Sequence, residues 1–535
     1  MVVVGLFLLF WSLRSWLHID YSGLTGPDLF TDLWSGNISN HLHSNHTSET
    51  DTTAAAAVTS QNTPSKDRTS APQQENALLN ESESTSVQGF ASAGQQDSPV
   101  LKGYPKPKNL KVAVIETNGV HEEVMAALIY AFGSQPDTEI QLYKKEPRWG
   151  IQKIVDRFHL PKVGEWQRWE EFRDNGIHNP PDIMIFTTCY DDPRNLESTM
   201  HQLLNRGRTY AFCIVHKSNT WDEPVPDQDK VLRPWAEKKL LSFITLSPAV
   251  TRTIQEIGME SWPRQGDQKI ERTIRNFAPV FPVTLPPLPL IEDEKEMEEK
   301  VKDWIALQGI WSPERRNFDR TFTHFQRLVN DLAGGADTDA KPDESTDELT
   351  DEEIGEEIDE DIDEKDLPPE HRKRNDLMPL NGSSIELHLI GHGEPRPVVP
   401  PKLRLQVIFH EKLLYQDFYN LLSMQTALIP AFSSDIYLWE KASSTIPAAL
   451  VAGCPPIVDA ETIKAYSYLT EESVYIQSEE ETEFDVLKRV MQEPRAWRIE
   501  KKRQVRLRTQ HIIKENALKV REWITEAKAA IGRFR

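Results

Sequence analysis

The chain has 535 residues, of which 38% are hydrophobic, and its formal net charge is −22. Residues 337–370 contain eighteen acidic side chains and two lysines, and their local charge of −16 leaves only −6 for the rest of the chain. The acidity therefore belongs to one segment, and no basic excess remains elsewhere for binding nucleic acid. The cysteines at 189, 213 and 454 lie in apolar stretches without paired spacing, which argues against a disulfide framework and against a zinc site.

The N-terminal residues MVVVGLFLLFWSL form an apolar run that ends at Arg14. If the Arg14 side chain snorkels, the run extends to about Ile19, so residues 1–19 are predicted to be a signal-anchor or a signal peptide. Residues 20–108 are predicted to be a disordered stem, because most of them are polar and aperiodic. Glycosylation sequons begin at Asn37, Asn45 and Asn80. This layout is typical of a single-pass type II protein of the Golgi or ER membrane with a lumenal folded part; secretion is the alternative.

From residue 109 the chain alternates apolar runs with helical patterns. Strands are expected at KVAVIE, TEIQLY, PDIMIFTTC, RTYAFCIVH and LSFITL, and a helix at HEEVMAALIYAFG. Continuous apolar strands separated by helices predict a parallel sheet covered on both faces. Residues 109–278 are therefore predicted to form a Rossmann-like domain. The proline-rich run APVFPVTLPPLPL then predicts an extended linker over residues 279–300.

A second α/β alternation is predicted over residues 301–535. Its strands are expected at WIALQG, SIELHLIGHG, LRLQVIFH, QTALIPAF, PPIVDA and SVYIQ, and its first helix at about Asn317 to Leu332. Residues 335–375 are predicted to be a disordered acidic insertion in this domain. The basic helical pattern that starts at TEFDVLKRVMQ predicts a pair of helices that closes the fold. The predicted fold class is α/β, with two Rossmann-like domains that face a cleft.

Ligands of such domains bind beyond the carboxyl ends of the strands, where three stretches carry candidate donor-binding residues. After the first strand come Gly309, which permits close backbone approach, and the pair Arg315 and Arg316, whose guanidinium groups suit a diphosphate. The next strand ends with Gly391 and His392. The third stretch places Ser443, Ser444 and Thr445 before IPAALVAG, where hydroxyl groups cap a helix and its free N–H groups bind phosphate. Gly453 is expected to end that helix.

These stretches carry a resemblance to a known family. Their order, and above all Glu-Lys-x-Ser-Ser-Thr-x-Pro-x-x-Leu-x-x-Gly-x-Pro-x-Val from Glu440 onward, resembles the donor domain of nucleotide-sugar-dependent glycosyltransferases of the two-domain GT-B fold. The chain is also similar to fungal glycosyltransferase-like proteins of families 4 and 1. The resemblance implies a hexosyltransferase-like enzyme without a metal or other cofactor. It implies a UDP- or GDP-sugar donor, a hydroxyl on a glycan, lipid or protein acceptor, and no nucleic-acid partner.

By this resemblance Glu440, Lys441 and the hydroxyl-bearing turn that follows face the donor sugar and its phosphates. An arginine of the pair at 315 and 316 neutralises the diphosphate. In the retaining branch of the fold the donor motif is Glu-x7-Glu, and Ala448 occupies the place of its second glutamate. That departure is the reason for an alternative reading, a catalytically inactive carbohydrate-binding or scaffold protein of the same fold.

Two histidines are candidate catalytic residues on the acceptor side. His121 follows the first strand and its loop, and His216 ends the strand YAFCIV, so both are expected at the cleft. A neutral imidazole there serves as a base toward an acceptor hydroxyl or as a hydrogen-bond donor to the sugar, although strand-end histidines often have structural roles. Further carboxylates follow the strands and are fallback bases for an inverting mechanism: Glu116, Asp191 and Asp192.

Overall fold

A computed structural model describes residues 109–218, 226–258, 273–293, 301–333 and 385–534, together with Lys295 and Met297. These residues belong to one compact unit, Pro107–Arg535. The predicted anchor, the stem with its sequons and the acidic insertion lie outside the described residues. No helix within the described ranges is both long enough and apolar enough to cross a membrane.

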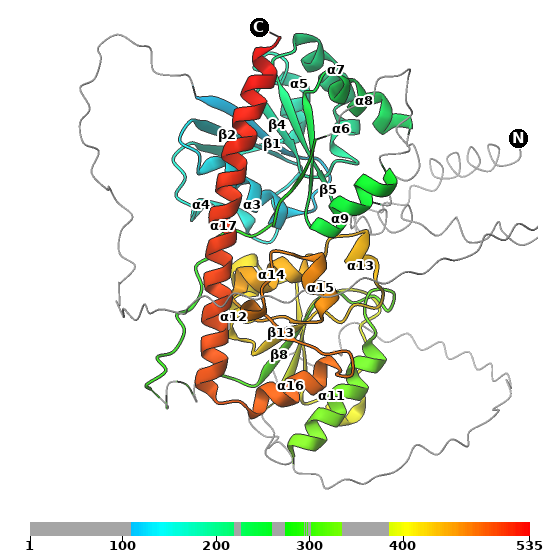
Figure 1. Cartoon of the computed structure of the whole chain (residues 1–535), viewed down its shortest axis with the longest axis vertical. Helices are drawn as coiled ribbons and strands as arrows, with labels where there is room; N and C mark the ends of the chain where they lie inside the picture. Colours follow the sequence, from blue (N-terminus) through cyan, green and yellow to red (C-terminus); the bar gives the residue numbers. More distant parts are fainter. Residues whose placement is uncertain are drawn as a thin grey trace, which may run out of the picture. The chain divides into compact units, whose positions relative to one another are not determined.

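Seven strands form the first sheet. They are β1 (Leu110–Glu116), β2 (Thr138–Lys144), β3 (Val163–Arg168), β4 (Ile183–Phe186), β5 (Tyr210–Val215), β6 (Leu241–Thr245) and β7 (Thr273–Asn276). All neighbours are parallel, in the order β3-β2-β1-β4-β5-β6-β7 (Figure 1). The five apolar strands were predicted, whereas the edge strands β3 and β7 were missed because their residues are mostly polar and partly exposed. The strand order reverses between β1 and β4, and ligands of such sheets bind at that point.

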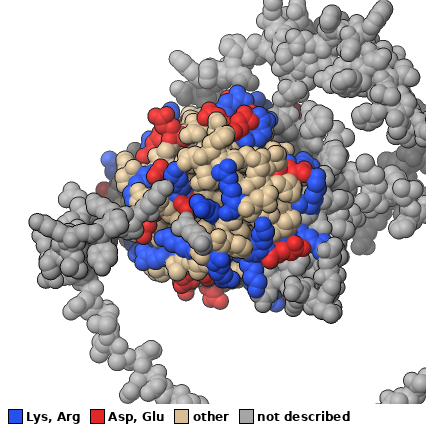
Figure 2. Space-filling view, turned by 90° about the horizontal axis from the view of Figure 1, so that it is seen from above, with Lys and Arg blue, Asp and Glu red and all other residues tan. Residues whose placement is uncertain are grey.

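Helices connect the strands of the first sheet. They are α3 (Glu122–Gly133), α4 (Ile151–Asp156), α5 (Trp169–Asn175), α6 (Asp192–Asn195), α7 (Glu197–Arg206), α8 (Pro226–Glu237) and α9 (Pro248–Thr253), which continues as a π-helical turn, η3 (Ile254–Gly258). On the face shown in Figure 2, basic and acidic side chains are both present and are interspersed with uncharged ones. Charges of both signs on this face agree with the small net charge that the sequence leaves outside its acidic segment.

The second sheet is smaller and also parallel. It contains β8 (Trp304–Ile310), β9 (Glu386–His392), β10 (Val407–Glu411) and β11 (Ala427–Ile429) in the order β10-β9-β8-β11. A bridge between Leu428 and Pro456 leads to a two-stranded extension, β12 (Ile457–Val458) and β13 (Tyr475–Ile476). The α/β class with two Rossmann-like parallel sheets is therefore confirmed.

The helices of this second part include α11 (Phe318–Leu332), which was predicted at about these bounds; the Asn317 side chain caps it by accepting from the Arg320 N–H. The others are η5 (Pro401–Leu403), α12 (Tyr415–Met424), α13 (Ile436–Trp439), α14 (Thr445–Ala452), α15 (Ala460–Ala465), η6 (Glu471–Ser473), α16 (Glu483–Gln492) and α17 (Arg495–Gly532). The last helix contacts both sheets' layers (Figure 1). Its Thr509 hydroxyl donates to Leu450 O of α14, and its Asn516 amide donates to Ala278 O beyond β7. One continuous hydrophobic core therefore joins residues of both sheets.

The structure corrects the expectation about the cysteines, because Cys189 and Cys213 form a disulfide. Cys189 follows β4, and its N–H donates to Ile214 O of the neighbouring strand β5 at 2.9 Å. The parallel order brings together two residues that are 24 apart in the sequence, a proximity that spacing alone does not reveal. Cys454 is buried as a free thiol, and burial raises its pKa to about 12.

Candidate functional site

Arg316 is buried beyond the carboxyl end of β8 with 4% of its surface exposed. Its Nη2 donates to Gln308 O at 3.0 Å and to Thr445 Oγ1 at 3.2 Å, and its Nη1 donates to Arg315 O at 2.9 Å. Its buried Nε has no hydrogen-bond partner. No carboxylate of the described residues pairs with this guanidinium, whose pKa is lowered mainly by burial. A buried cation without a counter-charge is costly and marks a place for an anion.

The start of α14 lies against this arginine. Ser443 Oγ accepts from the Thr445 N–H at 3.1 Å, and the Ser443 N–H donates to Tyr466 Oη at 2.9 Å. Ser444 is the N-cap residue, but it makes no side-chain capping bond and is exposed, so the predicted hydroxyl capping is made by Ser443 instead. Since Pro447 has no N–H and Ser443 occupies another donor, the helix offers fewer N–H groups to a phosphate than the sequence suggested. Arg316 is therefore the main donor here.

Two glycines make room for the arginine. Gly309 has φ +135°, and a Cβ built on it would lie 2.7 Å from Arg316 Nη2. Gly391 is its register partner on β9, and its Cβ would lie 1.9 Å from the Gly309 carbonyl oxygen. These glycines thus admit the protein's own groups. The next residue, His392, is exposed, and its carbonyl accepts from the Trp311 N–H at 2.8 Å.

Aromatic rings connect Arg316 to Lys441. The Arg316 guanidinium lies 5.7 Å from the centre of the Phe432 ring, and Phe432 stacks on Tyr437 at 4.7 Å. The Lys441 ammonium group lies 5.7 Å from the centre of the Tyr437 ring. Two cations predicted to bind the donor are therefore held on one aromatic pair.

The predicted donor and acceptor residues meet where two backbone segments pair. Lys441 forms an antiparallel bridge with Lys217, the residue after His216. Glu440 O accepts from the Ser218 N–H at 2.7 Å, and the Ala442 N–H donates to His216 O at 3.2 Å. This bridge brings Glu440 and Lys441 to the carboxyl end of β5, although they belong to the second sheet's connections.

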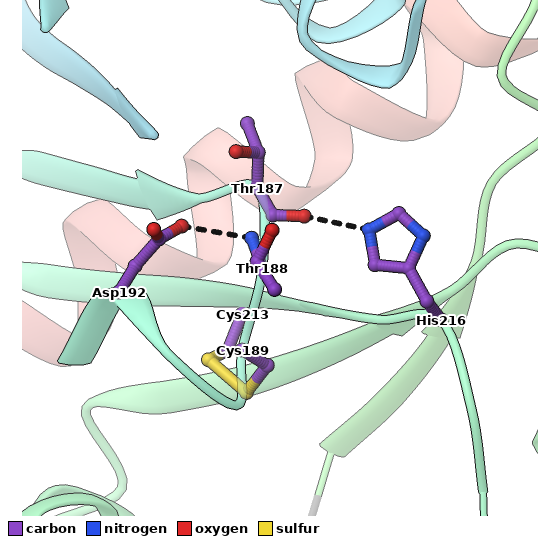
Figure 3. Close-up of a disulfide and its surroundings, with 6 residues drawn as sticks. All are labelled: Thr187, Thr188, Cys189, Asp192, Cys213 and His216. Atoms are coloured by element: carbon purple, nitrogen blue, oxygen red, sulfur yellow. Dashed lines mark hydrogen bonds between the residues drawn. A yellow bond between two sulfur atoms is a disulfide. The ribbon is translucent and has the colours of Figure 1, made fainter. Parts of the chain in front are cut away.

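His121 and His216 stack with their ring centres 3.6 Å apart. The His216 Nε2 lies 2.7 Å from Thr187 O (Figure 3), and because a carbonyl only accepts, Nε2 carries the proton and Nδ1 keeps its lone pair. The pKa of His216 is lowered to about 4, first by burial and then by the charges of Lys441 and Lys217, while the hydrogen bond to Thr187 acts in the opposite direction. The pKa of His121 is lowered well below its usual value by burial and by His216. Both imidazoles are therefore neutral at pH 7.

The fallback carboxylates have structural partners. Glu116 is fully buried, accepts from the N–H groups of the next loop at residues 118, 119 and 120 at 2.8–3.1 Å, and pairs with Lys144 at 2.6 Å. Asp192 accepts from the N–H and the hydroxyl of Thr117 and from the Thr188 N–H, each at 2.8 Å. Asp191 accepts from Arg194 at 3.1 Å. These carboxylates shape the loops, and the imidazole pair remains the candidate acid–base group.

A scan against protein-family models and a search of curated proteins give no match. Among solved structures the chain is similar to HepE of Anabaena in complex with UDP, at 9% identity and a TM-score of 0.44, over 78% of this chain and 100% of that one. It is similar to an alpha-glucosyltransferase in complex with UDP at 10% identity and a TM-score of 0.46, over 74% and 94%. For a UDP-N-acetylglucosamine 2-epimerase the values are 12%, 0.34, 74% and 90%. A likeness of this degree does not decide an activity, so the side chains have to carry the functional conclusion.

Several groups at this site gave no sequence signal. The carbonyls of Gln308 and Thr187 act through the backbone, which any residue type supplies. Phe432 and Tyr437 come together only through the turn between β11 and α13. Ser218 is visible as a serine after a strand-end histidine, but its contact with Glu440 depends on how the two sheets' connections pair.

Proposed function

We propose that this chain is a glycosyltransferase that moves a sugar from a nucleotide-sugar donor to a hydroxyl acceptor. The observation that carries the proposal is Arg316, a buried guanidinium with an unbonded Nε and no carboxylate partner in the described part of the chain. A diphosphate matches its planar donors and supplies the missing charge. The nearby neutral imidazole pair is what distinguishes a transfer site from a simple anion site.

The roles follow from the contacts. Arg316 and Lys441 hold the donor diphosphate and stabilise the charge that develops as the nucleotide leaves, so transfer requires no metal. His216 presents the lone pair of Nδ1 and accepts the proton of the attacking hydroxyl. His121 stacks on His216 and fixes the plane of its ring. The nucleotide sugar, UDP- or GDP-linked, is a co-substrate, and the acceptor is a glycan, lipid or protein.

One observation favours the alternative of an inactive carbohydrate-binding or scaffold protein. Ala448, at the place of the family's second donor glutamate, is 7% exposed within α14 and packs in the hydrophobic core. A ribose contact by that route is missing. The two hypotheses differ in whether a nucleotide-sugar donor is bound and turned over.

We also propose that the folded part lies in the lumen of the ER or Golgi, behind an N-terminal anchor. The Cys189–Cys213 disulfide supports this placement, because disulfides persist in oxidising compartments and are rare in the cytosol. Carbonate washing of membranes should leave the full chain in the pellet, and Asn45 or Asn80 should carry glycan. A cytosolic, unglycosylated product would overturn the localisation.

The function is tested on the purified full chain with a panel of UDP- and GDP-sugars. Thermal shift measures donor binding, and release of free nucleotide measures turnover with and without mixed hydroxyl acceptors. At least one donor should raise the melting temperature and be consumed. Binding without consumption overturns the proposed transfer, and no shift with any nucleotide sugar is the result expected of an inactive scaffold protein.

A further inference from the structure

The disulfide joins the two chain segments that also carry His216 and its hydrogen-bond partner Thr187. Two short arms meet there: residues 187–189, which follow β4, and residues 213–216, at the end of β5 (Figure 3). The Cys189–Cys213 disulfide joins the arms at one end, and the hydrogen bond from His216 Nε2 to Thr187 O joins them at the other. Between these ties the Cys189 N–H donates to Ile214 O at 2.9 Å. The two segments and these contacts form a closed ring. Among the contacts, only the hydrogen bond of His216 involves a side chain with a role in the proposed reaction.

The other side of the first arm is held by the framework of the sheet. The Thr187 N–H donates to Ile115 O of β1 at 3.0 Å, and the Thr188 N–H donates to Asp192 Oδ2 at 2.8 Å. Cys189 and Cys213 are 2% and 0% exposed, so the covalent tie is shielded from solvent. Of the ties between the two arms, the disulfide is therefore the one that backbone fluctuation does not open.

We infer that the Cys189–Cys213 disulfide is a positioning element of the site, which holds the Thr187 carbonyl against His216 and so fixes the tautomer of that imidazole. If the arms separate, Nε2 loses its acceptor, and the proton distributes between the two ring nitrogens. The nitrogen that faces the acceptor hydroxyl then lacks its lone pair for part of the time. The catalytic consequence rests on the proposed function, whereas the effect of the disulfide on the His216 tautomer is independent of it.

The test compares the full chain with Cys189→Ala/Cys213→Ala, and Cys454→Ala is the matched control because it removes a buried sulfur that forms no disulfide. Thiol titration of the denatured chain first checks the bond: one thiol without reductant and three with it, since the chain has three cysteines. Equal counts under both conditions would overturn the inference at once. If the alanine double variant fails to fold, Cys189→Ser/Cys213→Ser removes the same bond with side chains closer in shape to cysteine.

Two readouts separate positioning from general stability. Histidine ¹⁵N spectra, with His216→Gln for assignment, should show Nε2–H alone in the parent and a mixture of tautomers in the double variant. The double variant should also lose about tenfold in kcat, a small part of what general base catalysis contributes, with donor KM unchanged. The acid limb of its kcat–pH profile should move to lower pH. The Thr187 hydrogen bond raises the pKa of His216, so loss of that bond lowers the pKa.

The outcomes distinguish this inference from the proposed function. An unchanged His216 tautomer in the double variant overturns the inference, whatever the activity. A changed tautomer in a protein that consumes no donor supports the inference and overturns the proposed transfer. Equal losses in UDP affinity and kcat would mean that the bond only supports the fold, and would overturn the inference as well.

Discussion

Glu116 at the carboxyl edge of the first sheet and Arg316 at that of the second are both buried charged residues, but they differ in the partners that the chain provides. At the first sheet Glu116 has Lys144 as a counter-ion and three backbone N–H donors, so the chain satisfies its own charge. At the second sheet Arg316 is almost as buried, but it donates only to neutral oxygens and keeps an unbonded Nε. Glu116 is thus satisfied by the chain itself, whereas Arg316 keeps a buried donor that a ligand of negative charge would satisfy.

In the proposed function the first edge supplies geometry and the second supplies affinity for the donor. A satisfied network holds its loops in one arrangement, and the loop after β1 carries His121 into contact with His216. An unsatisfied buried cation raises the free energy of the empty site, and binding of an anion lowers that free energy again.

The largest effect is expected when the finished network is broken. Glu116→Gln removes the closer of the two carboxylates that pair with Lys144, Glu122 at 3.5 Å being the other, and an amide cannot accept from all of the donors around it. We expect a loss of about 3–5 kcal/mol in the free energy of unfolding, the usual cost of removing one partner of a buried pair. Urea unfolding measures it, with exposed Glu165→Gln as control. A loss equal to that of the control would contradict the description of this edge.

The elements that sequence predicted best are those whose signal is local. KVAVIE and its counterparts are continuous apolar runs, and they became β1, β4, β5 and β6 because both faces of the sheet are covered. The strand β3 was not predicted, because this edge strand has little apolar pattern. Gly453 ends α14 with φ 66°, as its residue type predicted.

The site was harder to predict because its contacts depend on strand order. The sequence placed Arg315 and Arg316 together and could not separate them, but in the fold Arg316 is buried and Arg315 is half-buried. The disulfide was missed for the same reason: Cys189 and Cys213 become neighbours only once β4 lies beside β5. No residue type announces that a carbonyl such as that of Thr187 will face a histidine.

The next effect tests how tightly the second edge is built. In Gly391→Ala the new methyl group would stand 1.9 Å from the Gly309 carbonyl oxygen, so β8 and β9 must separate where they flank Arg316. We expect the free energy of unfolding to fall by about 3 kcal/mol, which is at the upper end of the usual cost of overpacking. Gly532→Ala, which meets no atom within 4 Å, is the control in thermal unfolding and should be neutral. Equal melting temperatures for the two variants would refute the close approach.

A smaller effect in energy, but the most direct on function, is expected at Arg316. Arg316→Ala should weaken UDP binding about 10- to 100-fold, because a hydrogen bond to a charged group contributes about 1.5–3 kcal/mol. Arg316→Lys keeps the positive charge but lacks the planar guanidinium group, so its UDP affinity should lie between those of the parent and Arg316→Ala. Calorimetric titration measures the affinity, and exposed Arg320→Ala on α11 should bind as the parent does. Unchanged affinity in Arg316→Ala would mean that the open charge serves something other than a nucleotide.

The smallest effect concerns the proton on His216 and returns to the first edge. Its folded pKa is about 4, below the unfolded value of about 6.5, so between these values the unfolded chain binds more protons at this residue. The parent therefore loses stability through His216 as the pH falls from 6.5 toward 4, and gains nothing from it above 6.5. His216→Asn should lose less stability between pH 7 and pH 5 in urea unfolding, whereas exposed His178→Asn should keep the parent's slope. Parallel slopes for all the proteins would show that the imidazole titrates normally, and the first edge would then not fix its proton as the stacked, carbonyl-bonded geometry requires.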